Sequence, residues 1–502
     1  MDYGIVGGIL GVLNPYMMLL ILLGVVVGII FGAIPGLTAA TALALFLPVT
    51  FGMEATAGIV LLIGLYIGGI SGGLIPAIIL RMPGTPSSIA TTYDGSPMAL
   101  RGEAGKALGV GIVSSFIGGI FSTVMLIFIA PAIAKVALRF GPWEYFAIGI
   151  FSLSMISSLV SQSVAKGLGS AIIGLLISMI GAGPVDSVQR LTFGFHSLEA
   201  GLDLLPVMVG LFAVSELLKT AESVDQEDLE AVKFKLKGFG FSLREFFGTQ
   251  KINLTRSALI GLGIGILPGM GGSTSNLISY LAAKNQSKHP EKFGTGIIDG
   301  LVASETANNS TIGGALIPLM TLGIPGDGVT ALLLGAFLLH GISPGPLLFV
   351  NQGSLVYSVF GAVLIANLFM LVLMYLGLHP IARILKTPKY LLLPIIMIFC
   401  SVGAYSVNNR IFDIGVMLVL GVFGFYIEKL GFSLTPIVMG FILGPIVELN
   451  LRRGLMASKN SILPLFESPV AMVFLLIGLA SMGIPIVKWW VKRLRAIKNT
   501  EN

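Results

Sequence analysis

Charge and cysteine are both scarce in this sequence. Only 11% of its 502 residues are charged, whereas a soluble domain carries about 25% charged residues, so a soluble globular protein is excluded. The single cysteine, Cys400, lies inside an apolar run, and one thiol supplies neither a disulfide framework nor a thiolate metal site. The four histidines lie far apart, without the spacing of metal ligands. We therefore expect no cofactor and no metal site beyond one for a coupling ion.

Motifs of enzymes and of nucleotide binding are also missing. The sequence contains no hydrolase motif, and its Gly-rich stretches lack the lysine of a P-loop. Lys and Arg together number 30 against 24 Asp and Glu, but this excess is spread over loops and the C-terminal tail. A nucleic-acid-binding protein would gather its basic residues on one face. We therefore expect that the protein is not an enzyme and does not bind nucleic acid.

Apolar residues, glycine and proline are abundant instead. Hydrophobic residues make up 55% of the chain, which has 66 Gly and 25 Pro and a mean hydropathy of +0.95. Apolar runs long enough to cross a bilayer begin at 15–33 and recur as far as 469–487. The first residues lack the positive charge of a cleaved signal peptide, so the first run is expected to stay as a span. This composition predicts an all-α polytopic membrane protein with about 10 to 14 membrane segments.

The two halves of the chain resemble each other. Two blocks recur in the same order: Gly32-Ala33-Ile34-Pro35-Gly36 matches Gly265-Ile266-Leu267-Pro268-Gly269, and Leu74-Ile75-Pro76 with Pro83-Gly84 matches Leu316-Ile317-Pro318 with Pro325-Gly326. The pattern predicts homologous transmembrane repeats at 1–218 and 257–450. Between them, 219–256 holds 13 charged residues and reads as a cytoplasmic linker, and 451–502 is a final span with a basic tail.

Repeats that contain Pro-Gly interruptions are typical of secondary transporters. Breaking a helix inside lipid frees backbone N–H and C=O groups, which is tolerated only where protein, water or a ligand takes them up. Transporters use such broken helices or helical hairpins to form a site at the bilayer midplane, usually between inverted repeats. We therefore expect a midplane cavity between repeats, with inversion as the favoured arrangement.

The first candidate site follows Pro83, where hydroxyl side chains gather. Gly84 lets the backbone turn, and Pro86 suits the first turn of a new helix. The free N–H groups of that helix and the hydroxyls of three residues would bind a carboxylate; these residues are Thr85, Ser87 and Ser88. The alternative is an N-cap at a hairpin tip that binds no ligand.

Three further glycines and a serine complete the predicted substrate site. Gly326 matches Gly84 in the second half, and Gly36 matches Gly269, which is followed closely by Ser273. We expect the Pro-Gly tips to meet across one cavity and to offer backbone N–H groups to an anion. The alternative at Gly36 and Gly269 is a close approach of two helices.

The most polar run within a predicted span lies in the second half and is the candidate cation site. Amide, hydroxyl and carboxylate oxygens suit Na⁺, and an ionisable residue inside a membrane is a functional candidate. The predicted cation-binding residues are Glu305, Asn308, Asn309 and Thr311. The alternatives are hydrogen bonding between helices for the asparagines and an interfacial cap for Glu305. For Asp327, a cap on the following helix is favoured over ligand contact.

Several of these stretches resemble one transporter family. They are Met82-Pro83-Gly84-Thr85-Pro86-Ser87-Ser88, Tyr93-Asp94-Gly95-Ser96-Pro97-Met98, Arg101-Gly102-Glu103-Ala104-Gly105-Lys106, the run from Glu305 to Gly326, Thr330 to Ala336, and His340-Gly341-Ile342-Ser343-Pro344-Gly345-Pro346. Together they resemble the large membrane subunit (TctA-like) of the tripartite tricarboxylate transporter family, over nearly the full chain. The resemblance implies a cation-coupled importer of citrate-like di- or tricarboxylates in a prokaryotic inner membrane. It also implies two partners: a small four-span membrane subunit and an extracytoplasmic solute-binding protein.

The expected function is therefore secondary active transport of a small organic anion, coupled to Na⁺ or H⁺. Lys488-Trp489-Trp490, followed by more basic residues, places positive charge beside an aromatic belt and favours a cytoplasmic C-terminus. The alternative function is an anion channel or a lipid-handling membrane protein.

Overall fold

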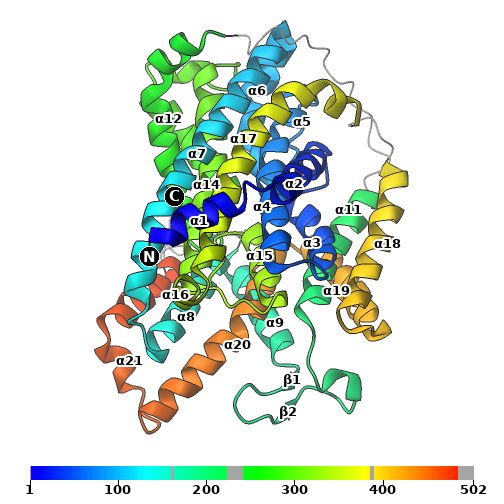
Figure 1. Cartoon of the computed structure of the whole chain (residues 1–502), viewed down its shortest axis with the longest axis vertical. Coiled ribbons are helices and arrows are strands. Elements are labelled where there is room, and N and C mark those ends of the chain that lie inside the picture. Colours follow the sequence, from blue (N-terminus) through cyan, green and yellow to red (C-terminus); the bar gives the residue numbers. More distant parts are fainter. Residues whose placement is uncertain (1, 160–162, 223–240, 385–388, 484–502) are drawn as a thin grey trace, which may run out of the picture. The chain divides into compact units, whose positions relative to one another are not determined.

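The computed structural model describes residues 2–159, 163–222, 241–384 and 389–483 (Figure 1). These residues form two compact units. Unit 1 comprises Met1–Lys135 and Phe212–Arg410, and unit 2 comprises Val136–Leu211 and Ile411–Asn502. Each unit thus takes one segment from each half of the chain. The predicted boundaries at 218, 256 and 450 separate repeats of sequence, whereas the compact units are defined by contacts between residues. The units therefore do not test these boundaries, which stay a prediction.

The described residues are almost entirely helical, with one short antiparallel pair of strands, β1 (Gly181–Ala182) and β2 (Gln189–Arg190). Seven helical stretches are long and apolar enough to cross a membrane: Pro15–Ala33, Ala55–Ile79, Pro86–Ala137, Leu204–Glu222, Gly353–Gly377, Ile411–Lys429 and Leu434–Ala457. Five shorter apolar helices have 10–17 residues. The prediction of an all-α polytopic membrane protein is therefore confirmed. The number of 10 to 14 membrane segments stays a prediction, because length and composition alone do not place the shorter helices in a bilayer.

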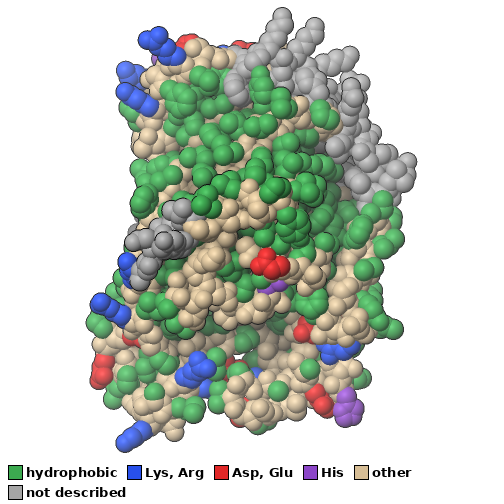
Figure 2. All heavy atoms as spheres, viewed as in Figure 1, with side chains coloured by type: hydrophobic (Ala, Val, Ile, Leu, Met, Phe, Trp, Pro, Cys, Tyr) green, Lys and Arg blue, Asp and Glu red, His purple; other side chains and the backbone are tan. Residues whose placement is uncertain are grey.

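The exposed surface is apolar where a bilayer would contact it. Figure 2 shows hydrophobic side chains over much of the visible face. Leu376, Val419 and Ile398 are 63–70% exposed, each on a long apolar helix. Such contiguous apolar exposure is unusual for a soluble protein and normal for lipid contact.

Unit 1 contains two helix pairs that pack by the same means. In the first half, α2 (Pro15–Ala33) lies against α4 (Ala55–Gly72); in the second, α12 (Leu243–Ile266) lies against α14 (Ile298–Leu322). A Cβ built on Gly28 of α2 would lie 2.4 Å from the Leu65 carbonyl oxygen, and one on Gly261 of α12 would lie 2.3 Å from that of Ala307. Small residues thus bring both helix pairs into backbone contact. This similarity supports the predicted duplication, which itself stays a prediction, as does its inversion.

All four predicted Pro-Gly breaks are confirmed. In the first half, α2 ends before Pro35-Gly36 and α3 (Ala39–Thr50) follows, while α5 (Leu74–Ile79) ends before Pro83-Gly84 and is followed by η1 (Pro86–Ser88) and α6 (Ile89–Met98). In the second half, α12 ends before Pro268-Gly269 and α13 (Gly271–Gln286) follows. The last break is at Pro325-Gly326, between α14 and α15 (Gly328–Leu339). Each break leaves helix ends whose backbone groups need partners from outside the helix.

The remaining elements of unit 1 surround these breaks. They are α1 (Asp2–Gly11), η2 (Ala99–Glu103), most of α7 (Ala104–Ala137), α11 (Ser215–Glu222), η5 (Pro290–Lys292), α16 (Pro346–Asn351), α17 (Gly353–Ile384) and α18 (Lys389–Asn408). The predicted linker 219–256 is helical at both ends, since Lys219 belongs to α11 and residues from Leu243 onward belong to α12. Its middle part, 223–240, lies outside the described residues.

Unit 2 is built from α8 (Pro142–Leu159), α9 (Val164–Ser178), η3 (His196–Leu198), α10 (Leu204–Met208), the first residues of η4 (Val209–Val214), α19 (Ile411–Lys429), α20 (Leu434–Ala457), α21 (Leu463–Glu467) and a helix at 469–483. Arg190 of β2 pairs with Glu448 of α20 at 2.8 Å, and Arg452 pairs with Asp186 at 2.6 Å. The hydrogen bond from Arg452 lowers the pKa of Asp186 below its ordinary value, helped by the backbone N–H of Val188. The basic tail that predicts a cytoplasmic C-terminus lies outside the described residues.

Candidate functional site

The first tip carries the hydroxyls that the sequence singles out. Pro86 occupies the first position of η1, and Thr85 is the N-cap. The hydroxyl of Ser88 accepts from the backbone N–H of Thr85 at 3.2 Å and donates to the Thr85 carbonyl at 2.9 Å. Thr85 and Ser87 share a hydrogen bond of 3.0 Å between their hydroxyls. The predicted cap is therefore present, and all three hydroxyl groups are buried.

The second tip is the N-terminus of α13. Gly269 and Gly271 have φ angles of +80° and +59°, a region that glycine adopts without strain. The N–H of Gly269 donates to the carbonyl of Gly326 at 2.8 Å, which joins the two breaks of the second half. Met270 provides no side-chain cap, and within the described residues the N–H groups of Gly271 and Gly272 have no acceptor. This helix end therefore keeps free donors and a positive dipole end.

Asn308 lies where the two tips meet. A Cβ built on Gly272 would lie 2.6 Å from Asn308 Oδ1 and 2.9 Å from Ser87 Cβ. Asn308 is 1% exposed, and neither its Nδ2 nor its Oδ1 has a hydrogen-bond partner in the described part of the chain. A buried amide without partners carries a desolvation penalty of about 1–3 kcal/mol. Such a group is expected to meet a ligand or water.

These groups form a neutral, hydrogen-bond-donating site. The free N–H groups of α13, the amide of Asn308 and the hydroxyl of Ser87 come from both halves of the chain and lie within unit 1. A helix N-terminus with free N–H groups binds carboxylates and phosphates. Gly272 and Ser273 are partly exposed, whereas Asn308 and Ser87 are buried.

The other predicted substrate glycines are held by packing. A Cβ on Gly84 would lie 2.5 Å from the Gly32 carbonyl oxygen, and one on Gly326 would lie 2.5 Å from that of Gly265. Neither glycine has a positive φ, so close backbone contact, and not the turn that we expected, requires glycine there. Gly36 has a φ of +93° and lies against Thr220, whose hydroxyl donates to its carbonyl.

Glu305 lies in the middle of α14 and is fully buried. Its Oε1 accepts from the hydroxyl of Thr91 in α6 at 2.5 Å, and its Oε2 accepts from the hydroxyl of Ser115 in α7 at 2.8 Å. Glu305 lies seven residues after Ile298, the first residue of α14, so its side chain does not cap this helix. Three helices of unit 1 therefore converge on one carboxyl group whose side-chain partners are both hydroxyls.

The other two predicted cation ligands make contacts between helices. The Oδ1 of Asn309 accepts from Ser71 of α4 at 2.6 Å, and its Nδ2 donates to the Glu305 carbonyl at 3.2 Å. The Thr311 hydroxyl bonds to Ser275 of α13 at 2.6 Å and to the Ala307 carbonyl at 2.8 Å. The four predicted cation ligands thus each have different neighbours, and their role in cation binding stays a prediction.

Two further buried carboxylates in unit 1 have structural partners. Asp327 caps α15 through the Thr330 N–H at 2.7 Å, as predicted, and accepts from the Tyr66 hydroxyl at 2.7 Å. Asp94 accepts from the N–H groups of Gly294, Gly296 and Ile297 at 2.7–3.0 Å. Both carboxylates are therefore held in place by backbone donors that belong to a turn or a helix start.

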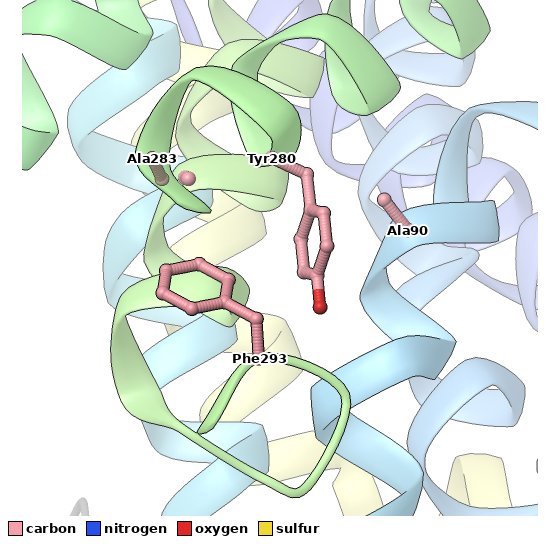
Figure 3. Close-up of a cluster of buried hydrophobic side chains, with 5 residues drawn as sticks. Ala90, Tyr280, Ala283 and Phe293 are labelled. Carbon is pink, nitrogen blue, oxygen red and sulfur yellow. The ribbon is translucent and has the colours of Figure 1, made fainter. Parts of the chain in front are cut away.

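Tyr280 extends the contacts of Asp94 into an aromatic cluster. Its hydroxyl donates to Asp94 at 3.0 Å. Figure 3 shows its ring between Phe293 and Ala90, in a cluster that joins α13 to α6 and to the loop before α14. A pocket of about 490 Å³ beside this cluster is lined by Tyr93, Lys284 and Phe293 among others. None of the predicted substrate-binding or cation-binding residues lines this pocket.

Sequence reasoning missed three contributors: Thr91, Ser115 and Asn276. Asn276 accepts from the N–H of Ala90 at 2.8 Å and so caps the start of α6 from the opposite half of the chain. Its place four residues after Gly272, within the Gly-Ser-rich run, was an available signal. Ser115 is one of two adjacent serines in a largely apolar span, a pattern that marks polar residues turned toward a protein interior.

Comparison with known proteins agrees with this architecture. Residues 18–439 match the family described as "Tripartite tricarboxylate transporter TctA family". This chain belongs to that family. The family is one of transporters, so the chain is a multi-pass membrane component of a transport system.

Two relatives come from Agrobacterium vitis. One, described as an uncharacterized 52.8 kDa protein in the TAR-I ttuC' 3' region, is 35% identical over 477 residues, covering 95% of this chain and 94% of the relative. The other, an uncharacterized protein in the TAR-II ttuC' 3' region, is 38% identical over 224 residues, covering 45% of this chain and 93% of the relative. No solved structure was found to match the chain.

Proposed function

We propose that this TctA-family member is a secondary active transporter that imports a small di- or tricarboxylate. The observation that carries the proposal is the unpartnered Asn308 amide between Ser87 and the N-terminus of α13. An amide with free donor and acceptor atoms beside free backbone N–H groups suits a carboxylate group, which accepts several hydrogen bonds at once. Family membership supports a citrate-like substrate.

The proposed transport is coupled to Na⁺ or H⁺. Among the described residues of unit 1, the buried Asp and Glu side chains are Asp94, Glu305 and Asp327. No buried Lys, Arg or His within the described residues offsets the charge of an entering anion. A co-transported cation supplies the missing positive charge, and Glu305 is the carboxyl group with the fewest fixed donors.

The proposed setting follows the family. We place the chain in a prokaryotic inner membrane with its C-terminus in the cytoplasm, as the large subunit beside a small four-span subunit and an extracytoplasmic solute-binding protein. A reporter enzyme active only outside the cytoplasm, fused after residue 502, should be inactive. Activity of that fusion would contradict the proposed orientation.

Uptake by proteoliposomes tests the transport function. The purified chain, alone and with its neighbouring subunits, is reconstituted and supplied with radiolabelled citrate under an inward Na⁺ gradient, an inward proton gradient or neither. We expect saturable uptake that needs one of the gradients. Gradient-independent, non-saturable flux would instead favour an anion channel, and lipid movement without citrate flux would favour a lipid-handling protein.

A further inference from the structure

The three buried carboxyl groups that the structure describes in unit 1 differ in their hydrogen-bond donors. Asp94 accepts three backbone N–H groups, and Asp327 accepts a backbone N–H as a helix cap. Within the described part of the chain, Glu305 accepts from two side-chain hydroxyls, those of Thr91 and Ser115. Hydroxyl groups both donate and accept, so these two partners are compatible with either a carboxylate or a carboxylic acid at Glu305.

The hydroxyl partners of Glu305 have further acceptors available. The Thr91 hydroxyl lies 3.4 Å from the Ser304 hydroxyl oxygen. It can therefore donate its hydrogen bond to Ser304 while it accepts a hydrogen bond from protonated Glu305. On the remaining side, Gly111 and Leu74 leave an apolar wall, since a Cβ on Gly111 would lie 3.6 Å from Leu74 and 3.8 Å from Glu305 Cγ. The surroundings therefore accommodate the neutral acid without an unsatisfied proton.

Charged and titratable groups on the elements that pack against α14 do not supply a counter-ion. None of the described basic residues on these elements is buried. They lie on α7, α12 and α13 and at the C-cap of α15, and they are Lys106, Lys135, Arg244, Lys251, Arg256, Lys284 and His340. The other groups are Glu245 on α12, Tyr93 and Asp94 on α6, Tyr280 on α13, Tyr66 on α4 and Asp327 at the start of α15. Of these, the buried ones form the pairs Tyr280–Asp94 and Tyr66–Asp327.

The backbone around Glu305 does not favour a sodium site. Transporters ligate Na⁺ largely with carbonyl groups of unwound helix, whereas α14 is continuous from Ile298 to Leu322. The nearby Asn309 oxygen already accepts from Ser71. Two hydroxyls and one carboxylate provide fewer oxygen ligands than a hard cation prefers, which is about six.

Glu305 and Asn308 lie one turn apart on α14. Side chains at positions i and i+3 of a helix are neighbours, with about 5–6 Å between their Cβ atoms. A carboxylate bound at Asn308 is therefore repelled by an ionised Glu305 in a buried environment, where charge interactions are weakly screened.

We propose that Glu305 is the proton-coupling group of the transporter: it takes up one proton from water as the carboxylate binds beside Asn308, and releases it as the carboxylate leaves. The O–H bond forms on a carboxylate oxygen of Glu305, whose charge changes from −1 to zero, and one of its hydroxyl partners accepts the new hydrogen bond. This inference rests on the proposed function and selects H⁺ over Na⁺ as the coupling ion.

The test counts protons during binding. Calorimetric titration of citrate into the purified full-length chain, at one pH in two buffers of different ionisation enthalpy, gives the net protons taken up per citrate. The same titration on Glu305→Gln removes the contribution of citrate itself. Asp327→Asn is the matched control, because asparagine caps a helix about as well as aspartate does.

We expect wild type and Asp327→Asn to take up one more proton per citrate than Glu305→Gln does. Over the range where Glu305 is ionised in the free protein, wild-type affinity should fall about tenfold per pH unit as pH rises, because binding consumes a proton. Glu305→Gln mimics the neutral acid and should bind citrate without this dependence.

The other possible outcomes contradict either this inference or the proposed function. Equal proton uptake in wild type and Glu305→Gln, or a folded Glu305→Gln that does not bind, overturns the inference. So does Na⁺-dependent binding without proton uptake in wild type. If Glu305→Gln fails to fold, the pH dependence of wild-type affinity, corrected for citrate's own ionisation, still decides. A wild-type chain that binds no carboxylate contradicts the proposed function itself.

Discussion

At the residue scale, two adjacent asparagines have opposite environments. Asn309 bonds to Ser71 and to the Glu305 carbonyl, whereas Asn308 has no partner within the described chain. Adjacent positions on a helix point in directions that differ by about 100°, so only one of the two faces the tips. Their roles should therefore separate: binding for Asn308 and packing for Asn309.

We predict that Asn308→Ala weakens citrate binding roughly 10- to 100-fold, since a hydrogen bond to a charged group contributes about 1.5–3 kcal/mol. Its thermal stability without ligand should stay near wild type. Asn309→Ala should instead lower stability by about 0.6–1.7 kcal/mol, the measured range for hydrogen bonds between membrane helices. Thermal-shift assays with and without citrate measure both effects. Equal losses in both variants would remove the distinction.

Gly272 offers a steric test of the same site. We predict that Gly272→Ala lowers citrate affinity about tenfold or more, because its Cβ would lie 2.6 Å from Asn308 Oδ1 and occupy space between Asn308 and Ser87. Gly263→Ala on α12 is the control, because nothing lies within 4 Å of its added Cβ. Calorimetry on both variants measures the affinity. Wild-type affinity in Gly272→Ala would place the substrate elsewhere.

At the element scale, the breaks depend on close backbone contacts. We predict that Gly84→Ala and Gly326→Ala each destabilise the protein by about 1–3 kcal/mol through overpacking, since each new Cβ would meet a backbone carbonyl at 2.5 Å. Gly248→Ala, with no atom within 4 Å, is the control. Thermal unfolding in detergent measures the difference. Unchanged stability in both tip variants would mean that the breaks adjust freely.

The loop before α14 depends on one carboxylate. We predict that Asp94→Ala destabilises the loop, because three N–H groups lose their acceptor at about 1–3 kcal/mol for each one that stays buried. Trypsin should then cut faster at Lys288 and Lys292. Glu291→Ala, at an exposed position in the same loop, should leave the cleavage rate unchanged. Equal rates in the two variants would contradict the role of Asp94.

The breaks could be predicted from the sequence, because proline and glycine act locally on the backbone. The caps at Thr85 and Asp327 follow from the same short-range chemistry. The environment of Glu305 could not be predicted in this way, because Thr91 and Ser115 precede it by 214 and 190 residues. Which of Asn308 and Asn309 faces the tips likewise depends on how α14 packs, which local sequence does not determine.

At the scale of the whole molecule, the candidate site belongs to one compact unit. Ser87, Gly272, Asn308 and Glu305 all lie in unit 1, although they come from both halves of the chain. The sequence predicts two consecutive repeats, which stay a prediction, and the contacts define two compact units that each contain a segment from both halves. Duplicated halves that exchange segments would produce this pattern.

We predict that citrate protects only part of the chain from hydrogen exchange. Slower exchange is expected at the start of α13 in unit 1, because the bound carboxylate accepts from the N–H groups there. The ion-paired segment 181–203 of unit 2 should be unaffected. Mass spectrometry with and without citrate measures the change in exchange rate. Protection confined to unit 2 would contradict a site in unit 1.

The most direct test of the central claim is a cryo-EM structure of the purified chain with bound citrate. We predict a carboxylate group within hydrogen-bond distance of Asn308 Nδ2, Ser87 Oγ and the Gly272 N–H. Citrate density in the pocket lined by Tyr93, Lys284 and Phe293 instead, with the Asn308 amide still unoccupied, would contradict the account.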